Sequence, residues 1–473
     1  STERATNSNN LNIQPLGYER IRVSLLASEQ RHLEIRYSQR GSGQVIMSPD
    51  PTNALHKGCP MRFTLSLLLM LVAGQATAAD NWSQFRGPRG DGSTDAKLPL
   101  TWSESENVKW KIPIHGKGWS SPVIWDDQLW LTTATEDGKQ MSALCIDRHS
   151  GKVLKDIVVF ENEEPQFCHP TNSYASCTPV IEESRLYVHF GSYGTACLDT
   201  ASGEKVWERR DLECNHWRGP GSSPIVSGDK LIVAYDGYDY QFVVAFDKNT
   251  GQTAWRRDRE IDYGTDNGDR KKAYSTATAF DHNGRTQIIS PSASESIAYD
   301  ADSGDVLWRV RHGGMNAAPK PVYAHGLVYI AAGEGPLSLI AVKPDGSGDV
   351  TDTHIAWGFG KSAPKRPSPV IVGELMFMIN DEGVASCIDA KTAKVIWQER
   401  VGGEYRASPI VANGRIYFFS MDGTTPVIAA SEEYKLLANN KLSSGFQASP
   451  AVAGNSLYLR TITDLYCIEP SSP

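Results

Sequence analysis

The chain has 473 residues, of which 40% are hydrophobic and 22% charged, and its formal net charge is −8. This composition is typical of a globular protein with a large core, and it excludes a fibre, a wholly disordered chain and a membrane bundle. The negative charge also argues against the basic surface that non-specific nucleic-acid binding needs, so we expect no nucleic-acid partner.

The first eighty residues predict an exported protein. Residues 1–60 are rich in Ser, Asn and Arg, and we interpret them as a disordered upstream extension. The next stretch, MRFTLSLLLMLVAGQATAAD, has a basic start, an apolar core and small residues before the end, which are the features of a secretory signal peptide over 61–79. The apolar core is too short for a transmembrane segment, and no cysteine at the cleavage site could accept a lipid. We expect a periplasmic or secreted protein whose mature part is 80–473.

A repeat begins at residue 120. It consists of a small residue, then in most copies a Pro, then two apolar residues, a turn and an apolar strand. Each copy starts 40 to 57 residues after the previous one. The eight copies are SSPVIWDDQLWL at 120, CTPVIEESRLYV at 177, SSPIVSGDKLIV at 222, STATAFDHNGRTQII at 275, APKPVYAHGLVYI at 318, PSPVIVGELMFM at 367, ASPIVANGRIYF at 407 and ASPAVAGNSLYL at 448. This spacing predicts an all-β, eight-bladed β-propeller of four-stranded antiparallel blades. The degenerate copy at 275 leaves the blade count open by one.

A second signature follows each anchor and is clearest in AFDKNTGQTAW at 245–255. The acidic residue and the Thr or Ser cap a tight hairpin, Gly supplies the positive φ, and Trp packs between adjacent blades. We therefore assign a structural docking role to the tryptophans, which are Trp110, Trp207, Trp255, Trp308, Trp357 and Trp397.

The last repeat ends without a fourth strand. VKWKIPI at 108–114 precedes the first anchor and has the pattern of an outer strand. We expect this N-terminal strand to complete the last blade, because pairing the two chain ends removes the open edges of the ring.

The recurring motif resembles the pyrroloquinoline-quinone-like (PQQ-like) repeat, whose tryptophan-docking motif reads Ala-x-Asp-x-x-Thr-Gly-x-x-x-Trp. The resemblance covers about 81–470, including the opening NWSQFRGPRGDG, which is similar to secreted propellers of this superfamily. It implies the propeller fold and leaves two functions open. Some members are quinone-dependent dehydrogenases that hold pyrroloquinoline quinone (PQQ) with calcium. Others are cofactor-free, such as the propeller lipoprotein of the outer-membrane β-barrel assembly machinery.

The cysteines of the expected mature part form two groups. Cys145, Cys197, Cys387 and Cys467 each lie two residues before the acidic residue of the repeat, and we interpret them as small buried side chains. Three others lie outside this pattern. In an oxidising compartment, a disulfide between Cys168 and Cys214 is our first choice among them, with a free thiol left over.

Candidate binding residues come from the loops that open on one face of a propeller, around its central channel. The positions three before each anchor Pro, or before its equivalent, carry Trp119, Ser176, Gly221, Tyr274, Asn316, Arg366, Arg406 and Gln447. Longer loops add Asn172, Tyr174, His216, Trp217, Arg218, Lys365 and Tyr405. Tyr, Trp and Arg are the residues that recognition surfaces favour. The alternative is a hydrated channel mouth with no ligand.

No hydrolase motif is present, and the one dense oxygen-ligand cluster, Asp262, Asp266, Asn267 and Asp269, lacks the spacing of a helix-loop-helix calcium site. We interpret it as a solvated loop. The preferred function is a non-enzymatic, monomeric scaffold of the cell envelope, with a protein partner or a small anionic ligand, no cofactor and no catalytic or metal-binding residue. Envelope protein assembly is one role that the resemblance implies. The alternative is a PQQ- and calcium-dependent alcohol or sugar dehydrogenase.

Overall fold

A computed structural model describes residues 81–335, 337–360 and 362–470, together with three short strands in the first fifty residues. The chain divides into two compact units, Ser1–Gln75 and Ala76–Pro473.

Within the first unit, three strands pair antiparallel in the order β1-β2-β3. They are β1 (Arg20–Val23), β2 (Leu33–Arg40) and β3 (Gln44–Pro49). The rest of the upstream extension and the whole of the signal peptide expected over 61–79 lie outside the described residues. The disorder and the export signal therefore stay predictions.

The described part of the second unit forms eight four-stranded antiparallel blades, as the repeat predicts, and so resolves the blade count. The first four blades follow chain order. They are β6 (Val123–Trp125), β7 (Gln128–Ala134), β8 (Gln140–Asp147) and β9 (Val153–Glu161); β10 (Val180–Glu182), β11 (Arg185–His189), β12 (Thr195–Asp199) and β13 (Lys205–Arg209); β14 (Ile225–Ser227), β15 (Lys230–Asp236), β16 (Gln241–Asp247) and β17 (Thr253–Asp258); and β18 (Thr278–His282), β19 (Arg285–Pro291), β20 (Glu295–Asp300) and β21 (Val306–Arg311).

The other four blades are built in the same way, and the last one borrows a strand from the N-terminal side. They are β22 (Val322–Ala324), β23 (Leu327–Ala331), β24 (Leu339–Val342) and β26 (Ile355–Phe359); β27 (Val370–Val372), β28 (Leu375–Ile379), β29 (Val384–Asp389) and β30 (Val395–Arg400); β31 (Ile410–Ala412), β32 (Arg415–Tyr417), β33 (Thr424–Ala429) and β34 (Leu436–Lys441); and β35 (Ala451–Ala453), β36 (Ser456–Arg460), β37 (Asp464–Ile468) and β5 (Val108–Pro113).

Short strands and helical turns lie beside the blades or between their strands. Two strands add in parallel to blade edges: β4 (Ser93–Thr94) pairs with β31, and β25 (Gly348–Asp349) pairs with β21. The helical turns are η1 (Gly191–Tyr193), η2 (Gly268–Lys271) and α1 (Thr351–His354). Among the described residues, none of the helices is long and apolar enough to cross a lipid bilayer.

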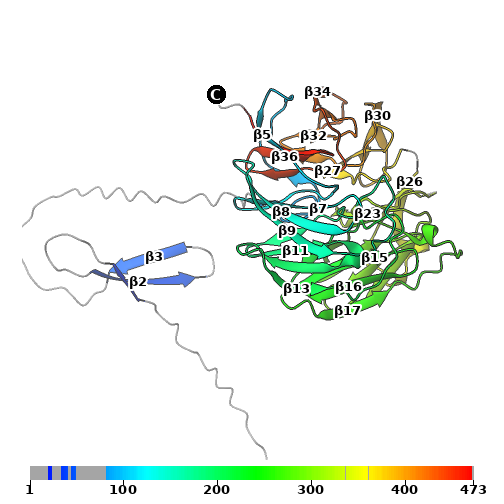
Figure 1. Ribbon diagram of the computed structural model, residues 1–473, viewed down its shortest axis with the longest axis horizontal. Coiled ribbons are helices and arrows are strands. Elements are labelled where there is room, and N and C mark those ends of the chain that lie inside the picture. Colours follow the sequence, from blue (N-terminus) through cyan, green and yellow to red (C-terminus); the bar gives the residue numbers. More distant parts are fainter. Residues whose placement is uncertain are drawn as a thin grey trace, which may run out of the picture. The chain divides into compact units, whose positions relative to one another are not determined.

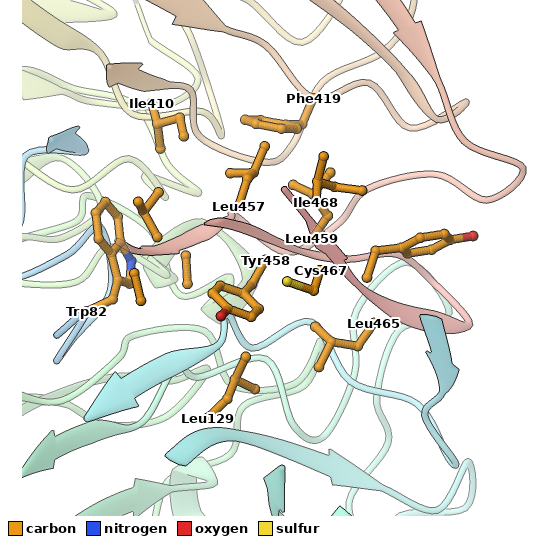
Figure 2. Close-up of a cluster of buried hydrophobic side chains, with 14 of the residues drawn as sticks. Trp82, Leu129, Ile410, Phe419, Leu457, Tyr458, Leu459, Leu465, Cys467 and Ile468 are labelled. Carbon is orange, nitrogen blue, oxygen red and sulfur yellow. The ribbon is translucent and has the colours of Figure 1, made fainter. Parts of the chain in front are cut away.

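The ring closes through the two ends of the propeller sequence. Strand β5 pairs antiparallel with β37, with Trp110 opposite Cys467, and Figure 1 shows β5 beside the red C-terminal strands. This confirms the closure that the sequence predicts. Around the closure, Trp82 and Leu129 from the start of the propeller pack with Phe419, Leu457 and further residues from its end (Figure 2). The core of the ring is therefore continuous across the joint.

Five of the six motif tryptophans donate their indole N–H to a carbonyl in a hairpin turn of the next blade. The distances are 3.0 Å from Trp110 to Arg148, 2.9 Å from Trp207 to Lys248, 3.2 Å from Trp255 to Ala301, 3.0 Å from Trp357 to Ala390 and 3.1 Å from Trp397 to Ser431. The turn glycine lies under the ring: a Cβ on Gly151, which has φ of +74°, would lie 2.8 Å from the Trp110 indole. Trp308 differs, since it donates to Gln287 of its own blade. The turn that follows in the fifth blade lacks the Asp-x-x-Thr-Gly pattern.

A belt of hydrogen bonds joins the innermost residues of neighbouring blades. The residue before each anchor Pro, or before its equivalent, is Ser or Thr in seven blades and Lys320 in the fifth. In six blades its backbone N–H donates to the hydroxyl of the next blade. The observed links are Ser121 to Thr178, Thr178 to Ser223, Ser223 to Thr276, Lys320 to Ser368, Ser368 to Ser408 and Ser408 to Ser449, at 2.9 to 3.0 Å. Between the eighth and first blades the link is made by the buried guanidinium of Arg460, which donates to Ser120 and Thr132. The belt fixes the diameter of the channel.

We predict that Trp110→Ala lowers the free energy of unfolding by about 2 to 3 kcal/mol, because the joint loses a large packed ring and a hydrogen bond. Urea unfolding followed by circular dichroism measures this change. The matched control is Trp217→Ala, which removes an exposed tryptophan outside the motif and should cost less than about 1 kcal/mol. Equal losses in the two variants would contradict a special role of the joint.

Candidate functional site

A cavity of about 250 Å³ opens at the centre of the propeller, on the face formed by the loops between blades. Its wall carries all eight residues predicted from the position three before the anchor Pro. They are Trp119, Ser176, Gly221, Tyr274, Asn316, Arg366, Arg406 and Gln447. In the fifth blade the strand register makes Pro321 the anchor instead of Pro319, and Ala318, three before it, also lines the wall beside Asn316. Below them lie six hydroxyls of the belt, Ser121, Thr178, Ser223, Thr276, Ser408 and Ser449. The repeat therefore places one residue per blade at the same height around the channel.

Of the seven further candidates from the longer loops, three line the cavity: Asn172, Arg218 and Lys365. Asn172 ties two loops together, because its amide donates to the carbonyls of Arg218 and Pro220 at 2.9 and 3.0 Å. This bond gives the wall between the first and third blades a fixed shape.

The other four candidates do not line the cavity. Tyr405 is buried against Phe418, and Tyr174 donates its hydroxyl to the carbonyl of Gln166 at 2.8 Å. His216 is buried and accepts from the backbone N–H of Ser192, and its burial lowers its pKa well below the usual value. Trp217 lies in a separate groove on the outer side of the same loop. Adjacent residues on an extended or turning chain point in different directions, so loop membership alone does not place a side chain.

The cavity wall is cationic. Arg218, Lys365, Arg366 and Arg406 line it, whereas Glu334 is its one carboxylate among the described residues. Arg218 is paired with Asp269 through two hydrogen bonds of 2.8 and 2.6 Å, and Arg366 is paired with Asp381. Asp269 belongs to the acidic cluster of the sequence, and its role here is to hold an arginine.

Arg406 has a different environment. Its guanidinium donates to the backbone carbonyl of Thr171 at 3.2 Å and to the side-chain oxygen of Gln447 at 3.4 Å, and no carboxylate of the described residues lies within 4.0 Å. Burial lowers the pKa of Arg406 and the neighbouring charge of Arg366 lowers it further, while the more distant carboxylates of Glu404 and Asp381 oppose this shift. Arg406 is thus a half-buried cation that faces a cavity and whose hydrogen-bond partners among the described residues are neutral.

The N-terminal segment closes the other end of the channel, which the sequence pattern did not reveal. Its Trp82 forms an antiparallel bridge with Ile124 of the first blade, and its Gly92 accepts from Val411 of the seventh. Between these points Arg86 donates to the carbonyl of Pro369 at 2.7 Å, next to the sixth blade. Ser83 accepts from Ile181 of the second blade, which lies four blades from the sixth in the ring of eight, so the segment crosses the channel, and its Phe85 lines the cavity.

Comparisons with known proteins agree with this architecture. The family model described as outer membrane protein assembly factor BamB matches residues 239–472. The BamB of Moranella endobia (strain PCIT) is 24% identical over 217 residues, which are 42% of this chain and 52% of that protein. The crystal structure of BamB from Moraxella catarrhalis superposes with a TM-score of 0.56 at 14% identity, over 77% of this chain and 98% of that one.

The chain is a β-propeller whose repeats resemble the PQQ-like repeats of BamB. The match spans about half the length of the Moranella relative. A europium-containing methanol dehydrogenase has the same fold, with a TM-score of 0.60 at 10% identity over 82% of this chain and 97% of that one. At such identities the likeness to solved structures concerns the fold alone.

The cysteines of this propeller agree with one expectation and correct another. Cys145, Cys197, Cys387 and Cys467 are fully buried core residues, as their repeat position predicts. The expected disulfide is not formed, since Cys168 and Cys214 are both free thiols. Their sulfurs face different groups: that of Cys168 lies 3.7 Å from the carbonyl oxygen of Arg218, and that of Cys214 lies 3.7 Å from the carbonyl oxygen of Tyr240.

The belt of this propeller has one exceptional member, Lys320, which stands where the other seven blades have Ser or Thr. Its side chain is buried beneath the N-terminal segment, where a Cβ on Gly90 would lie 2.5 Å from its Nζ. Burial lowers the pKa of Lys320 to about 7, and the charge of Arg86 contributes in the same direction while Asp91 opposes it. The segment thus covers a lysine that titrates near neutrality.

We predict that this lysine makes stability depend on pH. Its folded pKa of about 7 lies below the ordinary value of 10.5, so between these values the unfolded chain binds more protons and the free energy of unfolding rises with pH. Lys320→Met removes the titrating group. The variant should be more stable than the natural protein at pH 7, and the difference should shrink by up to about 1.4 kcal/mol per pH unit as the pH rises towards 10.

Urea unfolding of both proteins between pH 6.5 and pH 9.5 measures the difference, and the comparison cancels the titration of every other group. A difference that stays constant or widens with pH would contradict the burial of a titrating Lys320.

Proposed function

We propose that this protein is a non-enzymatic propeller scaffold of the cell envelope, and that its central cavity binds an acidic group of a protein partner or a small anionic ligand. Arg406 carries the proposal, because a half-buried guanidinium without a carboxylate partner gains most from an incoming anion. Arg366 and Lys365 on the same wall add positive potential, and walls of low dielectric strengthen the attraction.

The size and chemistry of the cavity support a small anionic group. A volume of about 250 Å³ suits one or two carboxylate side chains or a small organic acid. The belt hydroxyls and the aromatic rings of Trp119 and Tyr274 provide further polar and planar contacts. An extended acidic peptide that enters the mouth would meet the arginines first.

The place in the cell is part of the proposal. The signal-like segment over 61–79 supports export to the periplasm, and the relatives whose printed name is outer membrane protein assembly factor support a role in assembly at the envelope. Such a role needs protein partners and no chemistry.

The alternative, a quinone-dependent dehydrogenase, has support in the shared fold of the methanol dehydrogenase. The residues of the cavity do not fit PQQ held by calcium. Calcium in proteins takes six to eight oxygen ligands, several of them carboxylates, whereas this wall has four cationic side chains and one carboxylate. Asp269 and Asp381 are already paired with arginines. In the described part of the chain, no three His, Cys, Asp or Glu side chains gather as metal ligands.

We predict that a tetraglutamate peptide and citrate bind the full chain in low salt and that Arg406→Gln weakens both at least about tenfold. The loss of a charge-assisted hydrogen bond, worth about 1.5 to 3 kcal/mol, is the reason. Isothermal calorimetry measures the affinities. Arg257→Gln is the matched control, because it removes the same charge from the outer strand β17.

Binding that Arg406→Gln leaves unchanged, or the same loss in the control variant, would refute the cavity as the anion site. So would the lack of any heat from both anions in low salt.

A further inference from the structure

The face of the propeller that holds the cationic cavity has a second surface, which is acidic and exposes several aromatic rings. An open groove of about 790 Å³ runs along the loops of the first three blades, and Phe167 and Trp217 line it. Their side chains are 52% and 44% exposed, and those of Tyr238 and Tyr240 beside them are 39% and 53% exposed. We name these four residues the aromatic patch. Contiguous exposed aromatics on a protein surface mark interaction sites.

Three rings of the patch, those of Phe167, Trp217 and Tyr238, contact one another through Trp217 and are held in place. The centroids of Phe167 and Trp217 are 5.2 Å apart, and those of Trp217 and Tyr238 are 6.0 Å apart. Trp217 adopts φ of +52°, which is uncommon for a bulky residue. Asn215 maintains this conformation, because its side-chain oxygen accepts from the Trp217 N–H at 2.9 Å and its carbonyl accepts from Tyr238 at 2.7 Å. The backbone therefore presents the indole to solvent at a small cost in strain.

The groove beside the patch is acidic. Its lining includes five carboxylates, which belong to Glu161, Glu163, Glu164, Glu213 and Asp239. Among the described residues, no cationic side chain lies within 4.0 Å of Glu163, Glu164 or Glu213. The one guanidinium of the lining, Arg210, is already held by the carbonyls of Tyr193 and Glu161 and by the side chain of Asn162, at 2.8 to 3.2 Å. The lining thus has five carboxylates against one guanidinium, a formal charge of −4, and Glu163, Glu164 and Glu213 form no ion pair within the described part of the chain.

We propose that this groove docks a basic, Lys- or Arg-rich extended segment of a protein partner. Charge complementarity selects this occupant. The charged ends of the Lys or Arg side chains pair with the carboxylates of the groove, and their aliphatic stems and guanidinium or ammonium groups contact the faces of Trp217 and Phe167. Cation–aromatic contacts are strongest with tryptophan, and arginine makes them most often.

This surface goes beyond the anion site and does not depend on it. Trp217 lines the groove, and its neighbour Arg218 lines the central cavity, so one loop separates an acidic site from a cationic one. A partner that carries both a basic and an acidic stretch would meet the two sites in a fixed orientation.

The test uses the full chain and a fluorescein-labelled peptide of four Gly-Arg repeats, with binding followed by fluorescence anisotropy in 50 mM and 300 mM salt. We expect saturable binding that weakens in high salt. Trp217→Ala should weaken it at least about tenfold through the loss of the cation–aromatic contact and of apolar area, and the double variant Glu163→Gln with Glu164→Gln should weaken it at least about fivefold.

The matched control is the double variant Glu432→Gln with Glu433→Gln, which makes the same charge change in an exposed glutamate pair elsewhere on the chain. It should stay within about twofold of the natural protein, and so should Arg406→Gln, which separates this proposal from the anion site. A thermal melt of each variant shows that it is folded.

Three results would overturn the proposal. The first is equal loss of binding in the groove and control variants, which means attraction by net charge alone. The second is a neutral oligosaccharide that competes fully with the peptide, which means a carbohydrate site. The third is concentration-dependent dimerisation of the chain that Trp217→Ala abolishes, which means that a second copy is the occupant.

Discussion

The structure depends on the hydrogen-bonded contact between neighbouring blades. A single four-stranded sheet has two apolar faces and cannot bury them alone, so each blade is stable only between two others. The inner strands show this, since β7 and β15 are buried along nearly their whole length, while the outer strand β5 alternates between half-buried and exposed residues. Neighbouring blades are joined at two places: by the hydroxyl belt near the central channel and by the tryptophans near the outer rim. The closure by β5 completes the ring.

The same contact determines where function can lie. Because the belt fixes one residue of each blade at the channel, the residues just before it must surround the mouth, whatever their chemistry. The ring from Trp119 to Gln447 follows from this geometry, and its chemistry is free to vary between propellers of one fold. In this chain the cavity wall is cationic, and the N-terminal segment with Phe85 lines the cavity opposite its mouth. A fold shared with dehydrogenases thus presents a wall suited to anions.

Most of the fold could be predicted from the sequence, because the same local pattern occurs eight times along the chain. Positions at a fixed offset from the anchor were placed correctly for the same reason, as Arg366 and Arg406 show. Loops that leave the repeat could not be placed: His216 is buried, Trp217 is exposed with a positive φ, and Arg218 faces the cavity, although the three are consecutive. Their directions depend on hydrogen bonds to distant loops, such as that of Asn172 to the Arg218 carbonyl.

Two features depend on contacts that the repeat does not encode. Lys320 interrupts a column of Ser and Thr residues, and only the structure reveals the segment that covers it. NWSQFRGPRGDG has the Gly residues of a turning segment, but its path across the channel depends on contacts with four blades, as with Ile124, Ile181, Pro369 and Val411. The free thiols of Cys168 and Cys214 depend in the same way on the conformation of loops outside the repeat.

The most direct test of the central claim, a cavity for anions without a metal cofactor, is calorimetric titration of the full chain with PQQ in the presence and in the absence of calcium. PQQ is itself an anion, so binding alone does not separate the two functions. The account predicts that any heat is the same with and without calcium and that the mixture does not reduce a redox dye when alcohols or sugars are added. Stoichiometric binding that requires calcium and supports dye reduction would contradict it and identify a dehydrogenase.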